Sequence, residues 1–226
     1  MKRFLIILFI VTSISYGQTE YSFDYLLHYN HINHIDSTKS KTIYFLTNSK
    51  DNSYSARITN KDSLNFNIHF FKYDLFFSNV VISKKNFQIA EFIGIECKNV
   101  FHSSNPYKNI VKDYDYVKLQ SQDSLEIYEI KNIKPKKERK IKNTATYVLK
   151  FNTSHPYHLP NLFEATPYEE WNVERDLPNN FISELLVYNS KNKLESSEIL
   201  IEYIKIDKKI KIITEECGSL FLDKFQ

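Results

Sequence analysis

The sequence predicts a mainly β protein, built as a strongly curved antiparallel sheet or half-barrel of roughly ten or more strands. Short segments in which apolar and polar side chains alternate recur along the chain, with polar turns between them. The 17 Phe and 16 Tyr residues are enough to fill a sizeable core. Helical patterns are nearly absent, so a sheet of this length must fold on itself or leave a concave apolar face.

The segment 21–29 has the clearest strand pattern, because large apolar residues at its odd positions alternate with mostly polar residues at its even positions. Similar alternation or a β-branched composition predicts further strands at 41–47, 53–59, 64–70, 75–82, 114–119, 125–133, 144–151, 181–188, 198–206 and 210–214. The segment 87–100 is predicted to hold one or two more strands around Gly94. Asn, Asp and Lys predict turns at 48–52, 60–62, 191–193 and 207–209.

One long excursion, 152–180, interrupts this series of strands. Pro156 and Pro160 prevent the preceding strand from resuming, since proline has no N–H for a sheet ladder. Thr166-Pro167-Tyr168-Glu169 is typical of a helix start, and it predicts one short helix near 167–173 with Trp171 as its apolar anchor. A long ordered excursion on a sheet scaffold is a common location for function.

Residues 1–17 are predicted to be a signal peptide, and 18–226 a single β-rich domain. Lys2 and Arg3 precede an unbroken apolar run of eight residues, 4–11, which is too short to span a membrane. No cysteine stands directly after this run, so the protein is not expected to be a lipoprotein. We therefore expect export to the periplasm or beyond the cell, with no transmembrane span in the mature chain.

Charge and glycine content argue against several classes of function. The chain has 30 basic and 27 acidic residues, and loss of Lys2 and Arg3 would leave 28 against 27. This near-neutral balance is unlike that of nucleic-acid-binding domains. With only three glycines, the chain has no phosphate-binding loop or dinucleotide fingerprint, and no cofactor is expected. A serine-hydrolase Gly-x-Ser-x-Gly motif is also absent from the sequence.

The two cysteines, Cys97 and Cys217, are predicted to form one disulfide, as expected for a lone pair in an exported protein. The alternative is two separate buried thiols.

Two groups of histidines are candidates for chemistry. His28, His31 and His34 are three residues apart, which would place the first two on opposite faces of a strand. We interpret them as solvated turn histidines, and no metal site is predicted. His155 and His158 lie in the excursion and, with Glu169, could form a polar site with acid–base chemistry. A polar rim to the sheet explains these residues equally simply.

Aromatic side chains on successive strands are candidates for binding an apolar ligand, and ordinary core packing is the alternative. The candidate ligand-binding residues are Tyr25, Phe45, Phe66, Phe70 and Trp171. The lysine-rich segment 131–142 could bind an anionic surface or partner, or could simply be a solvated hairpin tip.

Two resemblances follow from these features. The layout of signal peptide, antiparallel strands and sparse helix resembles the LolA/LolB-like half-barrels of the bacterial envelope, which bind lipid chains in a concave face. The segment 177–184, preceded by Asp176, resembles the signature region of the secreted GLPGLI proteins, although Asn180 stands where the second signature glycine would fall. This second resemblance implies an exported β protein and carries over no functional residues.

The leading hypothesis is therefore non-enzymatic binding of an apolar or lipid-like ligand in the cell envelope. The alternative is a protein-interaction or structural module of the cell surface, with an envelope protein as its partner. A third hypothesis is a hydrolase that uses residues of the 152–180 excursion.

Overall fold

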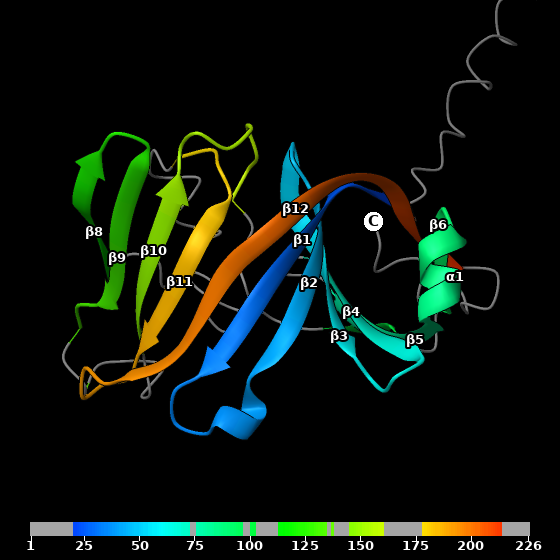
Figure 1. The fold of residues 1–226 in the computed structure, drawn as a ribbon, viewed down its shortest axis with the longest axis horizontal. Coiled ribbons are helices and arrows are strands. Elements are labelled where there is room, and N and C mark those ends of the chain that lie inside the picture. The colour runs from blue at the N-terminus through cyan, green and yellow to red at the C-terminus, as the bar shows by residue number, and fades with distance from the viewer. Residues whose placement is uncertain are drawn as a thin grey trace, which may run out of the picture.

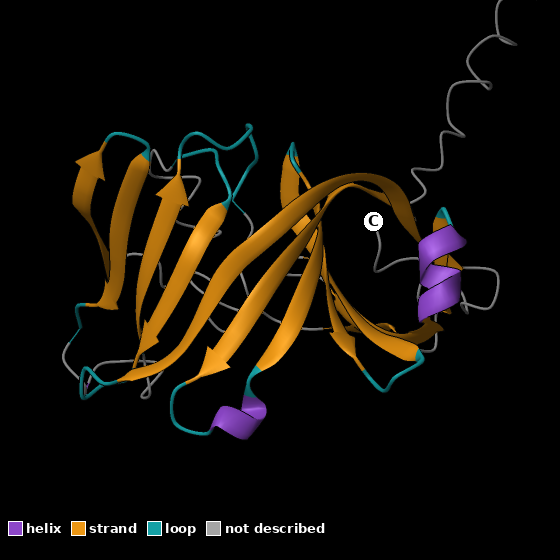
Figure 2. Cartoon of the chain, in the orientation of Figure 1, coloured by secondary structure: helices purple, strands orange, loops and turns teal. Residues whose placement is uncertain are grey.

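The computed structural model describes residues 20–72, 76–96, 100–102, 113–134, 137, 145–160 and 178–213. These residues form one sheet of twelve strands with two short helical segments (Figure 2). The strands are β1 (Glu20–Asn33), β2 (Lys41–Asn48), β3 (Asp51–Asn60), β4 (Asn65–Lys72), β5 (Phe76–Ser83), β6 (Phe92–Glu96), β7 (Val100–His102), β8 (Tyr114–Gln122), β9 (Leu125–Asn132), β10 (Thr146–Asn152), β11 (Ile182–Tyr188) and β12 (Leu194–Ile213).

The sheet is open and strongly curved, which confirms the predicted class. Its order is β7-β5-β4-β3-β2-β1-β12-β11-β10-β9-β8, and all of these neighbours are antiparallel. β6 lies outside this path and pairs in parallel with the end of β12. Figure 1 shows β8 to β11 as a fan on one side, and β2 to β5 with α1 and β6 on the other.

The helix of the described chain lies at a different place from the predicted one. α1 (Lys84–Ile89) begins after Ser83, whose hydroxyl accepts a hydrogen bond from the Asn86 N–H. This N-cap favours a helical turn over the start of the predicted strand 87–100, so that β6 begins only at Phe92. The predicted helix at 167–173 lies outside the described residues.

β12 corrects a second prediction. The expected turn at 207–209 does not form, and 194–213 is a single strand of 20 residues. Between Phe23 and Tyr25 of β1, the partner on β12 changes from Lys208 to Lys205, so β12 has one extra residue there. Such a bulge bends a strand without ending it. As a result, β1 and β12 arch together toward β6 and α1 (Figure 1).

The buried apolar residues form two separate cores, both served by β1. The capped core lies beside α1 and β6, and its buried members are Tyr21, Phe23, Leu46, Tyr54, Ala56, Ile58, Ile68, Phe70, Phe87, Ile93, Ile95, Val100, Ile210 and Ile212. The wide core extends across the β8–β11 side, and its buried members are Tyr25, Leu27, Tyr29, Ile43, Phe45, Tyr114, Tyr128, Ile130, Leu149, Phe151, Phe181, Ile182 and Leu185.

Aromatic contacts and a cap close the capped core. The Tyr21 ring lies 4.8 Å from that of Phe70 and 5.0 Å from that of Tyr54. Phe87 places α1 in this core. The Lys208 ammonium donates to the carbonyls of Phe87 and Ala90 at the end of α1 and lies 4.9 Å from the Phe87 ring centroid. A lysine at this position satisfies helix carbonyls that have no partner within the helix.

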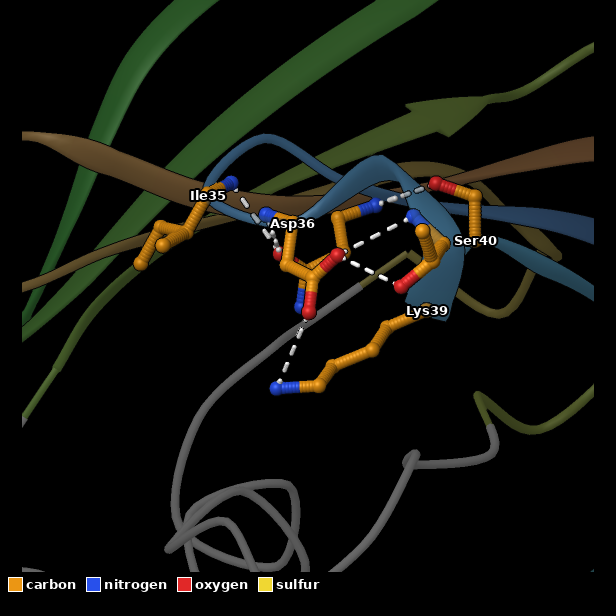
Figure 3. A network of polar contacts seen from close by, with 6 residues as sticks. Ile35, Asp36, Lys39 and Ser40 are labelled. Carbon is orange, nitrogen blue, oxygen red and sulfur yellow. Dashed lines mark hydrogen bonds and ion pairs between the residues drawn. The ribbon is translucent and has the colours of Figure 1, made fainter.

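A hydrogen-bonded turn fixes the opposite end of β1 (Figure 3). The Asn33 side-chain oxygen accepts from the Ile35 and Asp36 N–H groups, and the Asn33 N–H donates to the Ser40 hydroxyl. Asp36 accepts from Thr38 and pairs with Lys39 at 3.3 Å. This turn, which includes the 3-10 segment η2 (Ser37–Lys39), fixes where β2 begins relative to β1.

Candidate functional site

One face of the sheet carries an apolar stretch between two polar ends. On β1 this face presents Tyr25, Leu27 and Tyr29, which are buried, and then His31. Their partners on β2 run in order from Thr47, opposite Tyr25, to Lys41, opposite His31. The face therefore changes from aromatic to charged over seven residues of one strand.

His158 lies at the Tyr25 end of this face and is 1% exposed. Its ring stands 4.6 Å from that of Phe181 and 5.5 Å from that of Tyr25. Nε2 lies 2.9 Å from the Thr47 hydroxyl, and Nδ1 is in hydrogen-bonding contact with the Leu159 carbonyl. A ring N–H must donate to this carbonyl, so Nδ1 carries the proton and Nε2 accepts from Thr47. Burial lowers the pKa of His158 to about 4, which keeps the ring neutral.

Backbone contacts hold the His158 segment against the sheet. The His158 N–H donates to the Asn179 carbonyl, and the Leu159 N–H donates to the Ser49 carbonyl. The Asn180 side chain donates to the His155 carbonyl. Two parts of the excursion, 155–160 and 178–181, are thereby joined to each other and to the β2–β3 turn.

His155 lies beside His158 but has a different environment. Its ring stands 5.3 Å from Tyr203 and 5.8 Å from Phe181, and burial lowers its pKa. Its Nδ1 is buried and has no hydrogen-bond partner among the described residues. The partners of His158 are a hydroxyl and a carbonyl, which suits an anchoring role. Glu169, the third member of the predicted polar site, lies outside the described residues.

The other end of the face is built around Glu198 of β12. Glu198, His31 and Lys41 occupy directly opposed positions on β12, β1 and β2. Glu198 is 8% exposed, and its Oε1 lies 3.1 Å from His31 Nδ1. Its Oε2 is buried without a hydrogen-bond partner among the described residues. We call Glu198, His31, Lys41, Arg57 and His69 the charged end.

Arg57 and His69 extend the charged end along the same face. Arg57 of β3 is opposite Phe45 of β2, and His69 of β4 is opposite Arg57. Burial lowers the pKa of Arg57, and the Glu198 charge opposes this shift. Burial and then the Arg57 charge lower the pKa of Lys41, again opposed by Glu198. The Glu198 charge thus acts on cations from both β2 and β3.

Two further groups of the face respond to the same charges. Burial, followed by the charges of Arg57 and Lys41, lowers the pKa of His69. Burial and the Glu198 carboxylate raise the pKa of Tyr29, whose hydroxyl donates to the Ile182 carbonyl at 2.8 Å. Tyr29 belongs to the wide core, so the charged end directly adjoins the apolar stretch.

The predicted ligand-binding aromatic residues divide between the two cores. Tyr25 and Phe45 belong to the wide core. Phe70 is buried in the capped core, and Phe66 packs against that core with partial burial. Trp171 lies outside the described residues, as do both cysteines of the predicted disulfide, Cys97 and Cys217. The structure therefore brings two of the five candidates together on the face described above.

The interpretation of the first histidine group as solvated turn residues is confirmed for His34, which is exposed in the bend after β1, and is wrong for His28 and His31. β1 continues to Asn33, so His28 and His31 lie on opposite faces of a strand. His28 stacks on Tyr44 with ring centroids 4.8 Å apart, His31 pairs with Glu198, and His34 Nε2 lies 3.0 Å from the Ser197 hydroxyl. Among the described residues, no three His, Cys, Asp or Glu side chains are grouped so as to hold a metal ion.

Sequence reasoning missed Lys41, Arg57 and Glu198. Each stands in a segment predicted as a strand, where an isolated charged residue usually faces solvent. The sequence did contain one indication of their burial, because Arg57 stands between the apolar residues Ala56 and Ile58. Likewise, Glu198 directly precedes the apolar residues 199–201. Only the strand order places these charges on one face.

No protein-family model matches the sequence, and no curated protein matches it. Among solved structures, the chain is similar to a LolA superfamily protein from Nitrosomonas europaea, at 12% sequence identity and a TM-score of 0.30. The similarity covers 84% of this chain and 88% of that one. None of the helices in the described part of the chain has the length and apolar character needed to cross a membrane.

Proposed function

We propose that this protein is a non-enzymatic binding protein for an apolar or lipid-like ligand, which it holds against the face of the wide core. The predicted signal peptide at 1–17 would export it, so we propose the cell envelope as its site of action.

The observation that supports this proposal is the composition of the wide core. Its buried side chains come from six strands and from Phe181, and no helix of the described residues contributes to it. An apolar ligand can extend this burial at the margin of the core, where hydrophobic side chains are only partly buried. Partly buried hydrophobic residues, among them Tyr116, Tyr147 and Leu200, border the same core.

The polar groups at the two ends also fit a binding site. Ligand sites are mostly apolar, with a few precisely placed polar groups that fix the orientation of the ligand. Here the apolar stretch from Tyr25 to Tyr29 lies between the neutral His158 and the charged end. His158 is held by Thr47 and by its own segment, so it is suited to shaping the site.

The direct test is to look for a ligand that purifies with the protein. The full chain would be expressed with residues 1–17, isolated gently from the envelope fraction, and its native mass recorded before and after extraction with organic solvent. We expect additional mass that passes into the solvent. The stripped protein should then bind cis-parinaric acid, a fluorescent fatty acid, at micromolar concentration.

Neighbouring residues on β12 provide a matched pair of variants. Leu200 packs against the wide core, whereas Ile201 is 52% exposed. Leu200→Asn should weaken parinaric acid binding by about tenfold, the equivalent of roughly 1.4 kcal/mol of apolar contact, and Ile201→Asn should leave it unchanged. Protein that carries no extractable mass and fails to bind the probe would overturn the proposed function.

A further inference from the structure

The segment 155–160, which we call the strap, lies against the Tyr25 end of the apolar stretch. Hydrogen bonds to neighbouring segments, rather than a sheet ladder, hold it in place. Of its six residues, only His158 and Pro160 are buried. The His158 ring, which contacts Tyr25 and Thr47, is therefore the strap's main side-chain attachment to the sheet.

The groups in contact with the His158 ring include no carboxylate. The rings of Tyr25 and Phe181 stand 5.5 and 4.6 Å away, the Thr47 hydroxyl lies 2.9 Å from Nε2, and Nδ1 donates to the Leu159 carbonyl. A second proton on the ring would have to sit on Nε2, which now accepts from Thr47. It would force the Thr47 hydroxyl to give up that bond, and it would place a charge among aromatic rings.

The charged groups near this contact do not compensate. The Asp24 carboxylate favours a protonated ring, but it is already engaged by the Ser49 N–H and hydroxyl. On β12, Lys205 stands opposite Tyr25, and its positive charge opposes a second cation. Within the strap, burial lowers the pKa of His155 as well, so His155 acts in the same direction. The adjoining residues 178–181 contribute no ionisable side chain.

The attached strap therefore resists protonation, whereas an opened strap exposes its ring to water. We propose that the strap is an acid-operated release device: protonation of His158 detaches it from Thr47 and Tyr25, and the apolar ligand on the wide core is then released. This inference rests on the proposed function and adds its regulation.

The size of the effect follows from the two protonation equilibria of His158. Burial lowers its pKa to about 4 while the strap is attached, against an ordinary value of 6.5 for an exposed ring. Attachment is then at full strength above pH 6.5 and weakens as the pH falls toward 4. Between pH 7.5 and 5, the ratio of opened to attached strap should rise about 30-fold.

Hydrogen exchange measures this opening directly in the full chain without ligand. The Leu159 N–H donates to the Ser49 carbonyl across the strap contact, so its protection factor should fall about 20- to 30-fold from pH 7.5 to pH 5. The Ala90 N–H at the end of α1 is the internal control, and its protection should change less than about threefold. His158→Gln should abolish the fall at Leu159, whereas the matched variant His155→Gln should keep most of it.

Release is measured with N-phenyl-1-naphthylamine, an apolar fluorescent probe that is uncharged at both pH values. Its dissociation rate, followed by stopped flow, should rise about tenfold or more from pH 7.5 to pH 5 in the unmodified protein. In His158→Gln the rate should rise less than about twofold, since glutamine can accept from Thr47 and does not titrate in this range.

The outcomes separate this inference from the function on which it rests. If the probe does not bind at pH 7.5, the proposed function fails and release fails with it. If the probe binds but its dissociation is equally fast at both pH values, or accelerates equally in His158→Gln, the release device is overturned while apolar binding stands. Should His158→Gln not fold, NMR titration of the unmodified protein decides instead, because a His158 ring that titrates at its ordinary 6.5 overturns the proposal.

Discussion

The capped core and the wide core are of similar size but differ in how they are completed. Among the described residues, the capped core has fourteen buried apolar members and the wide core thirteen. α1 and β6 complete the capped core, and the Lys208 cap fixes α1 in place. The wide core has no helical member among the described residues, and its buried side chains come from six strands and from Phe181.

Buried carboxyl and imidazole groups mark the same difference. In the described part of the chain these are Asp113, His158 and Glu198, and each lies beside a member of the wide core. Asp113 precedes Tyr114, His158 contacts Tyr25, and the Glu198 charge acts on Tyr29. Burial of such groups is unfavourable unless they are paired or have a role. Under the proposed function, the capped core serves stability, whereas the wide core combines stability with recognition.

The largest effect is expected from removing one aromatic side chain from each core. Phe70 in the capped core is fully buried, and Phe45 in the wide core is 4% exposed. Phe70→Ala and Phe45→Ala should each lower the free energy of unfolding by about 3–5 kcal/mol, measured with urea at neutral pH. In the folded fraction, only Phe45→Ala should also weaken parinaric acid binding. Equal loss of binding in both variants would contradict the division of roles.

The second-largest effect is a pH dependence of the free energy of unfolding, which we expect from His158 beside the wide core. The pKa of His158 is about 4 in the folded protein, because of burial, against an ordinary value of 6.5. The unfolded chain therefore binds a proton more readily, and stability that is complete above pH 6.5 is lost as the pH falls toward 4. The full loss is about 3 kcal/mol. Hydrogen bonding to Leu159 and the charge of Asp24 on β1 partly favour the protonated ring.

The measurement is the free energy of unfolding between pH 7.5 and 4, with His158→Gln as the comparison. Glutamine can accept from Thr47 and does not titrate in this range, so the variant should have a markedly smaller slope between pH 6.5 and 4. An identical slope in the two proteins would mean that His158 is not the group responsible. Hydrogen exchange at pH 5 should show the loss first near Tyr25 and Phe181, and later near α1.

The sequence was sufficient to predict the sheet because alternation is a local property. The odd residues from Tyr21 to Tyr29 face one side of β1, as their spacing predicted. Their division between two cores, at the point where β12 has a bulge opposite Phe23 and Tyr25, does not follow from the alternation. Alternation identifies which side chains share a strand face, whereas strand order and curvature decide what that face meets.

The candidate site could likewise be predicted from the sequence only in part. Tyr25 and Phe45 were among the aromatic residues predicted as candidates for binding an apolar ligand, and both belong to the wide core. Phe70 was a candidate as well but belongs to the capped core. Through Ala56 it aligns with Leu46, whose side chain lies on the other face of β2 from that of Phe45. Glu198 and Arg57 are separated by 141 residues in sequence numbering, and two strands, β1 and β2, lie between theirs. No pattern of neighbouring residues in the sequence can indicate that two such distant side chains share one face of the sheet.

The smallest effect concerns the cap that makes the capped core different. Lys208 donates to the carbonyls of Phe87 and Ala90, so Lys208→Met should lower the free energy of unfolding by about 1–2 kcal/mol. Hydrogen exchange should accelerate in α1 and β6 while the strands of the wide core stay protected. Lys205→Met, three residues earlier on β12, removes the same charge from an exposed position and should change stability by less than about 0.5 kcal/mol. If Lys208→Met loosens both cores to the same degree, then α1 does not complete one of them in particular, and the two regions unfold as a single unit.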